Sequence, residues 1–169
     1  MKHALVLVAA LAATAHAEPA QPHALSATLS FTTLYRNSID HSGARFAAGY
    51  DYQVDRRSSL GVRAGLSVRP DGFGAVVLPY VGVRAHGWVF PNGVPIKLGG
   101  GAELWFNSAP VTDKRSEPVM VHVLAEVGPR FTLSKKWFLD VPAELGMLGF
   151  FQNPQIFSIQ FGAQLGHAW

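Results

Sequence analysis

The chain has 169 residues, contains no cysteine and carries a formal net charge of +3 at pH 7. This length suits one domain, and the lack of cysteine excludes disulfides and thiolate metal sites. A small, scattered positive charge gives no support to nucleic-acid binding. Charged residues make up only 15% of the chain, so the apolar residues must be spread along it without forming a long run.

Residues 1–17 have the features of a cleaved signal peptide. Lys2 supplies a positive start, and residues 4–13 form an apolar run that is too short to span a bilayer as a helix. Ala15 and Ala17 then give the small-x-small pattern that signal peptidase cuts. We expect an exported protein with its mature domain over residues 18–169. An uncleaved N-terminal helix is the alternative.

Eight segments of the remaining chain alternate apolar residues with polar or small ones at a period of two, which predicts β-strands. They cover residues 25–35, 45–54, 60–69, 77–86, 96–106, 119–130, 137–147 and 157–169. Most connections are short and rich in turn residues, so neighbouring strands should pair antiparallel. Two longer connections are expected at residues 36–44 and 107–118. The pattern predicts an all-β fold in which eight strands follow one another up and down around a barrel.

The alternation leaves open which face lines the barrel. An apolar lining would give a soluble, lipocalin-like binder of an apolar ligand, whereas an apolar exterior would give a transmembrane barrel. The less apolar face consists mainly of Gly, Ser and Ala with nearly balanced charges, which favours a transmembrane barrel with a filled polar interior. The expected interior ion network comprises Arg45, Asp51, Arg63, Arg84, Lys97, Glu103, Glu126, Arg130, Asp140 and Glu144.

Aromatic residues gather near the strand ends, as they do at the two interfaces of transmembrane barrels. The residues expected at one rim are Tyr35, Phe46, Phe106, Phe151 and Phe157. The residues expected at the other rim, which also carries both termini, are Tyr52, Trp88, Phe131, Trp137 and Trp169.

Turn positions predict which interior residues face each other. A hairpin centred on Arg57 places Asp51 opposite Arg63, and a slip of two residues is the first alternative. His122 and Glu126 stand four residues apart on one strand, or roughly 13 Å, which is too far for direct contact. We therefore interpret His122 as a polar filler. No histidines repeat at metal-ligand spacing, and we expect neither a metal nor a cofactor.

The last strand alternates apolar residues up to a terminal aromatic. Its outward residues are Phe157, Ile159, Phe161, Ala163, Leu165 and Trp169. This pattern resembles the C-terminal assembly signal of outer-membrane β-barrels, with His167 as a departure, and residues 79–85 resemble a strand of the same barrels. In pattern, the mature chain is similar to the small eight-stranded bacterial outer-membrane barrels, such as the membrane domain of outer-membrane protein A and outer-membrane protein X.

The resemblance implies insertion into the bacterial outer membrane as a monomer, with the last strand read by the barrel-assembly machinery. It also implies contact with outer-membrane lipid and lipopolysaccharide, for which Arg36, Lys114 and Arg115 are candidates. We expect a structural or envelope-interaction role and no open pore. A barrel enzyme that modifies lipid A or phospholipid is an alternative, but His122 lacks the His-x-Ser spacing of lipopolysaccharide-deacylating barrels.

Two prolines within predicted strands leave a further question open. Pro79 and Pro142 each remove a hydrogen bond from the strand ladder. Either residue indicates a local bulge or a lateral opening between strands.

Overall fold

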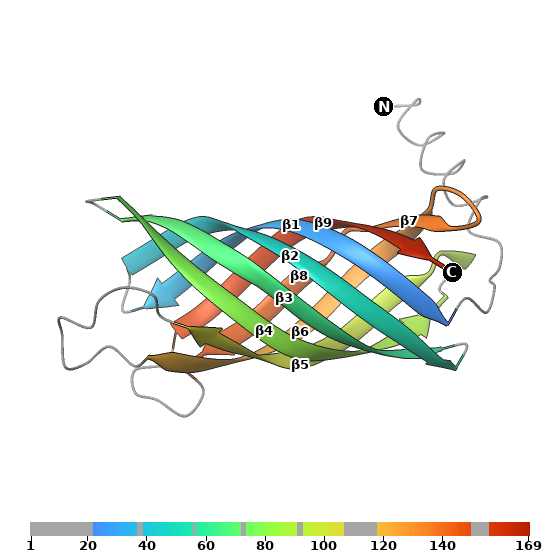
Figure 1. Ribbon diagram of the computed structural model, residues 1–169, viewed down its shortest axis with the longest axis horizontal. Helices are drawn as coiled ribbons and strands as arrows, with labels where there is room; N and C mark the ends of the chain where they lie inside the picture. The colour runs from blue at the N-terminus through green and yellow to red at the C-terminus, as the bar shows by residue number, and fades with distance from the viewer. Residues whose placement is uncertain are drawn as a thin grey trace.

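The strands form one closed antiparallel sheet (Figure 1). The computed structural model describes residues 22–36, 39–55, 57–71, 74–90, 93–106, 118–149 and 156–169. Within these residues the strands are β1 (His23–Arg36), β2 (Ile39–Asp55), β3 (Ser58–Asp71), β4 (Gly74–Val89), β5 (Ile96–Phe106), β6 (Val119–Thr132), β7 (Trp137–Asp140), β8 (Ala143–Leu148) and β9 (Ile156–Ala168). The proposed signal peptide and Phe151 lie outside the described residues, as do Lys114, Arg115 and the connection at 107–117.

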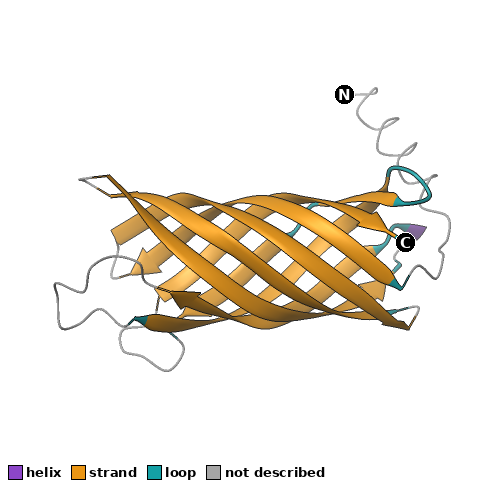
Figure 2. Cartoon of the chain, in the orientation of Figure 1, coloured by secondary structure: helices purple, strands orange, loops and turns teal. Residues whose placement is uncertain are grey.

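The ring closes where β1 pairs with both β2 and β9. Because β7 and β8 occupy one strand position between β6 and β9, eight strand positions surround the lumen in the described chain. Strand accounts for nearly all of that part (Figure 2). The predicted eight-stranded antiparallel barrel is confirmed. Among the described residues, no helix has the length and apolar character needed to cross a membrane.

The two ends of the barrel differ in what they carry. His23 and Trp169 lie side by side at one end, where their backbones exchange hydrogen bonds, and the β2–β3, β4–β5 and β6–β7 turns lie at the same end (Figure 1). We call this end the terminal rim. The other four connections join strands at the opposite rim.

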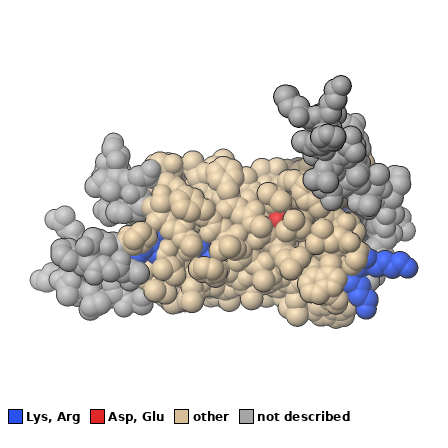
Figure 3. All heavy atoms as spheres, turned by 90° about the horizontal axis from the view of Figure 1, so that it is seen from above, with Lys and Arg blue, Asp and Glu red and all other residues tan. Residues whose placement is uncertain are grey.

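The apolar rows face outward and the charged residues face the lumen. Leu29 is 55% exposed and Val83 is 59% exposed, whereas Arg63 is 4% and Glu126 only 3% exposed. In Figure 3, uncharged residues cover almost the whole middle of the visible wall, and basic side chains project mainly at its ends. This arrangement excludes the lipocalin-like alternative, which needs the apolar residues inside.

Interior glycines make room for the large charged side chains of neighbouring strands. A Cβ atom on Gly61 would overlap the carboxylate of Asp51, and one on Gly146 would overlap the ring of His122. The small residues that the sequence places between the interior charges therefore have a packing role. A narrow eight-stranded lumen can hold these ions only where the adjacent position is nearly empty.

The connection expected at residues 36–44 is wrong. β1 continues to Arg36 and β2 begins at Ile39, and the two strands stay paired to that point. The period-two signal fades because the outer face becomes polar here, where the hydroxyl groups of Thr33 and Ser42 lie 3.2 Å apart. A strand with polar residues on its outward face has no outward apolar row to reveal it, although its backbone pairing is unchanged.

Pro142 interrupts the predicted seventh strand and divides it into β7 and β8. The register is the same on both sides of the break, with Asp140 opposite Arg130 and Ala143 opposite Val127. The amide of Gly162 donates to the Pro142 carbonyl at 3.1 Å, but Pro142 has no N–H to return that bond. The break is therefore local, and the strands on both sides of it remain paired.

Pro79 has a smaller effect on the ladder. It lies one residue beyond Tyr80 and Trp105, the last pair between β4 and β5. A proline at the end of a ladder removes little pairing.

We predict that Pro142→Ala stabilises the folded barrel. The new N–H would donate to the Gly162 carbonyl and raise the free energy of unfolding by about 0.5–1.5 kcal/mol. The thermal midpoint of the folded band on a gel, measured in detergent micelles, reports this change. Pro79→Ala is the matched control and should shift the midpoint less, and a lower midpoint for Pro142→Ala would contradict the prediction.

Candidate functional site

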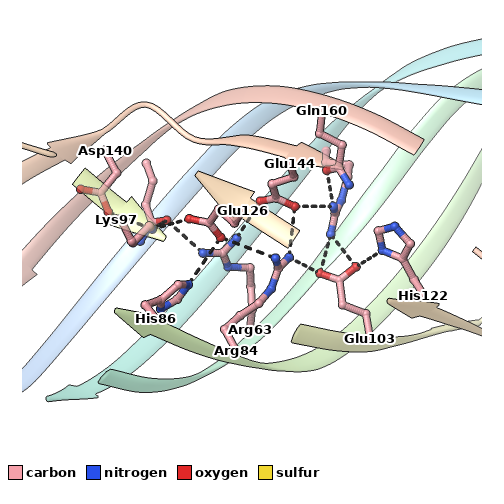
Figure 4. A network of polar contacts seen from close by, with 12 residues as sticks. Arg63, Arg84, His86, Lys97, Glu103, His122, Glu126, Asp140, Glu144 and Gln160 are labelled. Carbon is pink, nitrogen blue, oxygen red and sulfur yellow. Dashed lines mark hydrogen bonds and ion pairs between the residues drawn. The ribbon is translucent and has the colours of Figure 1, made fainter. Parts of the chain in front are cut away.

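Glu103 on β5 is the centre of a polar network that fills the lumen (Figure 4). Both of its carboxylate oxygens accept from Nη2 of Arg45, at 2.9 and 3.1 Å. Oε1 also accepts from Nη2 of Arg84 at 2.5 Å, and Oε2 accepts from the indole N–H of Trp105 at 2.8 Å. The ring Nδ1 of His122 lies 2.8 Å from Oε2. One buried carboxylate thus joins β2, β4, β5 and β6.

Two further acids face each other across β6 and β8. Glu126 lies opposite Glu144, and Arg84 contacts both, at 3.5 and 3.3 Å. Arg63 lies 3.3 Å from Glu144, and Lys97 lies 2.5 Å from Glu126. The two like charges are compatible with burial because cations from β3, β4 and β5 lie against them.

Two glutamines of β9 complete the network. Gln160 accepts a hydrogen bond from Arg45. The side-chain oxygen of Gln164 accepts from Arg63 at 2.9 Å and from Lys97 at 3.4 Å. The last strand is therefore tied to β2, β3 and β5 across the lumen.

The terminal rim is closed by a stack that we call the terminal plug: Trp88, Arg130 and Phe138. The Arg130 guanidinium lies 4.1 Å from the ring centre of Trp88 and 3.6 Å from that of Phe138. Arg130 also pairs with Asp140 at 2.7 and 2.9 Å. Trp88 was expected at the membrane interface, but it pairs with the buried Lys97 and so lies on the lumen side of β4.

The lumen near the opposite rim is closed by an apolar cluster, the apolar plug. It consists of Leu34, Leu78, Tyr80, Trp105 and Leu148, each at most 3% exposed. Arg45 stacks on two of its members, 4.1 Å from the Tyr80 ring centre and 5.0 Å from the Trp105 ring. The sequence reasoning missed this plug. Its signal is the unbroken apolar run at residues 76–81, where both faces of β4 are apolar.

The expected Asp51–Arg63 pair is wrong by two residues. Asp51 lies opposite Gly61, and Arg63 lies opposite Gly49. A register shift between Gln53 and Asp55 moves the hairpin off its expected centre. Asp51 lies 3.7 Å from the ring of His86 instead.

His122 has partners that sequence spacing could not supply. It lies directly opposite Glu103 on β5, and its Nε2 lies 2.8 Å from the hydroxyl oxygen of Ser158 on β9. This Ser158–His122–Glu103 order has the connectivity of a catalytic triad. All three side chains are buried, however, at no more than 2% exposure. Among the described residues, no group of three or more His, Cys, Asp or Glu residues is placed to hold a metal ion.

The aromatic residues predicted for the rims take several positions on the outer face. Tyr35 lies opposite Phe157 near the opposite rim, and Phe106 ends β5 there. Those near the terminal rim are Tyr52, Phe131, Trp137 and Trp169. Phe46 was expected at a rim but lies within the wall opposite Leu29, because β2 begins earlier than predicted.

The residues of the proposed assembly signal share the outer face of β9. They alternate with the buried side chains Ser158, Gln160 and Gln164. The outward set is Phe157, Ile159, Phe161, Ala163, Leu165 and Trp169.

Comparison with known proteins identifies the fold. No protein-family model and no curated protein sequence matches the chain. Neisserial surface protein A has a similar structure, with a TM-score of 0.73 and 12% identity over 90% of this chain and 100% of its own. The outer-membrane protein OprG from Pseudomonas aeruginosa has a TM-score of 0.57 at 6% identity, over 88% and 96%. The outer-membrane enzyme PagL has a TM-score of 0.55 at 11% identity, over 85% and 98%.

These structural neighbours are small bacterial outer-membrane β-barrels, and this chain has their fold. One of the three is an enzyme by its description, so the shared fold does not specify an activity.

We predict that Glu103→Gln strongly destabilises the barrel. The amide leaves Arg45 and Arg84 without a full counter-charge in a buried site, which costs about 3–5 kcal/mol in the free energy of unfolding. Urea titration followed by tryptophan fluorescence measures the loss. Asp51→Asn is the control: Asp51 is 17% exposed and its ring partner is 3.7 Å away, so the change should be small. Equal losses for the two variants would refute the central role of Glu103.

Proposed function

We propose that this protein is an outer-membrane barrel with a structural or envelope-interaction role and no open pore. The observation that carries the proposal is the pairing of an exposed apolar wall with a lumen filled by ion pairs. An exterior of this kind is stable in hydrocarbon, where a closed barrel satisfies every backbone hydrogen bond internally. In water, the same wall would be an aggregation site.

The sequence supports the route to that membrane. A signal peptide over residues 1–17 would direct export, and the outward residues of β9 would form the signal read by the barrel-assembly machinery. With the terminal rim in the periplasm, the β1–β2, β3–β4, β5–β6 and β8–β9 connections would face the cell exterior. Lipopolysaccharide phosphates would then meet basic residues of those connections.

The filled lumen supports a role other than transport. The apolar plug, the ion network and the terminal plug together occupy its length, and eight strands leave room only for side chains. Opening a path would require separating several buried ion pairs at once, including Arg84–Glu103 and Lys97–Asp140.

The enzyme alternative has one observation in its favour, the Ser158–His122–Glu103 chain. Its burial argues against substrate access, and a Cβ atom on the neighbouring Gly146 would already overlap the Ser158 hydroxyl. We therefore propose that this chain of hydrogen bonds stabilises the lumen and performs no hydrolysis.

We predict that the expressed protein is recovered from the membrane fraction only with detergent. Its apolar wall requires an amphiphile in place of lipid. An unheated sample should also migrate differently from a boiled one on a gel, because a closed barrel resists unfolding by the gel detergent at room temperature. Recovery of folded protein in the detergent-free soluble fraction would contradict the proposal.

We predict that lipid A and phospholipid masses are the same in cells with and without the protein. Ser158 cannot reach an acyl ester from inside the packed lumen. Mass spectrometry of extracted lipids tests this, with Ser158→Ala as the matched variant. Loss of an acyl chain that depends on Ser158 would establish the enzyme alternative.

A further inference from the structure

A continuous row of rings crosses the outer face at the terminal rim, which we call the rim strip. His167 lies between Trp137, at 4.9 Å between ring centres, and Trp169, at 6.1 Å. His23 follows, 6.0 Å from Trp169 and 5.5 Å from Tyr52. The strip consists of Trp137, His167, Trp169, His23, Tyr50 and Tyr52. It passes over the seam where β1 and β9 close the barrel (Figure 1).

The rim strip offers more hydrogen-bond donors than acceptors. Within the described residues its one internal side-chain hydrogen bond joins Nδ1 of His23 to the Tyr50 hydroxyl, at 2.6 Å. The two indole N–H groups can only donate. Of the described side-chain carboxylates near this rim, those of Asp51 and Asp140 face the lumen, and Asp55 is the last residue of β2, beyond Tyr52.

Two lysines lie beside the rim strip. The β6–β7 turn carries Lys135 and Lys136, both exposed. The Lys136 carbonyl accepts from the amide of Ala168 at 2.8 Å, which fixes the turn against β9 between the rings of His167 and Trp169. The turn spans residues 133–136 and contains no acidic residue.

We propose that the rim strip and these two lysines bind the phosphate of an anionic phospholipid headgroup. This inference rests on the proposed function, because only a barrel in a bilayer holds the strip at headgroup depth. Phosphate oxygens accept hydrogen bonds and so match a donor-rich surface, and tryptophan rings favour this depth. Because the strip covers the β1–β9 seam, a bound lipid would contact the first and last strands together.

The test compares lipid retention in nanodiscs of phosphatidylcholine that contain a minor fraction of phosphatidylglycerol. Native mass spectrometry counts the phosphatidylglycerol molecules kept by each barrel after the disc is removed. Wild type should retain phosphatidylglycerol in preference to phosphatidylcholine. Replacement of either lysine by glutamine, in Lys135→Gln or Lys136→Gln, should lower the preference for phosphatidylglycerol about fivefold. His167→Phe keeps a ring in the strip but removes its N–H donor, and should also lower it.

Arg57→Gln is the matched control. Arg57 is an exposed cation in the β2–β3 turn, which lies at the other end of the rim strip from the β6–β7 turn with the two lysines. The backbone N–H of Arg57 donates to the carboxylate of Asp55 at 2.6 Å. The carboxylate of Asp55, which accepts this bond, therefore already lies beside the arginine. The lipid preference should survive this change.

Two outcomes would overturn the lipid site. The first is an unchanged phosphatidylglycerol preference in the double lysine variant, and the second is an equal loss in Arg57→Gln, which would indicate general surface charge. The unboiled gel shift of the same samples separates this inference from the proposed function. A normal shift without lipid preference refutes only the lipid site, whereas failure of wild type to enter nanodiscs refutes the membrane barrel itself.

Discussion

The burial of ionised side chains in the lumen is the constraint on which the rest of the barrel depends. An ion moved out of water loses several kcal/mol of solvation, and only close, well-oriented partners restore it. Glu103 meets this requirement with Arg45, Arg84 and His122. Because these partners come from β2, β4 and β6, Glu103 connects three strands that are not neighbours of one another in the sheet. Backbone pairing between the strands closes the barrel, and the ion network fixes the positions of the side chains in its lumen.

The network is continuous with both plugs, so the lumen contents form one packed column. Arg45 links Glu103 to the rings of Tyr80 and Trp105. At the other end Asp140 pairs with both Lys97 and Arg130, and Arg130 lies between two rings of the terminal plug. Guanidinium groups suit both contacts because they bind carboxylates and stack on rings.

Period-two alternation was enough to predict the eight-stranded barrel and its outward apolar face. It fails wherever the contrast between the two faces disappears. Residues 39–44 contain no period-two row of apolar residues, and the run at 76–81 is apolar on both faces, so neither the extension of β2 nor the apolar plug was visible. The β2–β3 turn pairs Asp55 with Ser58, one residue from the expected register, and the bulge between Gln53 and Asp55 adds one more, so Asp51 lies opposite Gly61 and not Arg63. No composition argument anticipates either step.

Contacts across the lumen are even harder to predict from the sequence. Arg63 and Glu144 come from opposite walls, and their approach depends on the tilt and closure of all the strands together. The same holds for His122, whose acid partner is a cross-strand neighbour and whose hydroxyl partner belongs to the last strand. The spacing of His122 and Glu126 suggests a pair within one strand, whereas the acid that contacts His122 is Glu103 on the neighbouring strand.

The Ser158–His122–Glu103 chain shows why connectivity alone does not establish chemistry. In a catalytic triad the acid orients the imidazole and stabilises the imidazolium that forms during the reaction. Here the carboxylate of Glu103 is also bound by two arginines, Arg45 and Arg84, and is part of the ion network of the lumen. The Ser158 hydroxyl is buried, and a Cβ atom on Gly146 would already overlap it. Glu103 and Ser158 instead supply partners for both ring nitrogens of the buried His122, and the surfaces open to a ligand are at the rims.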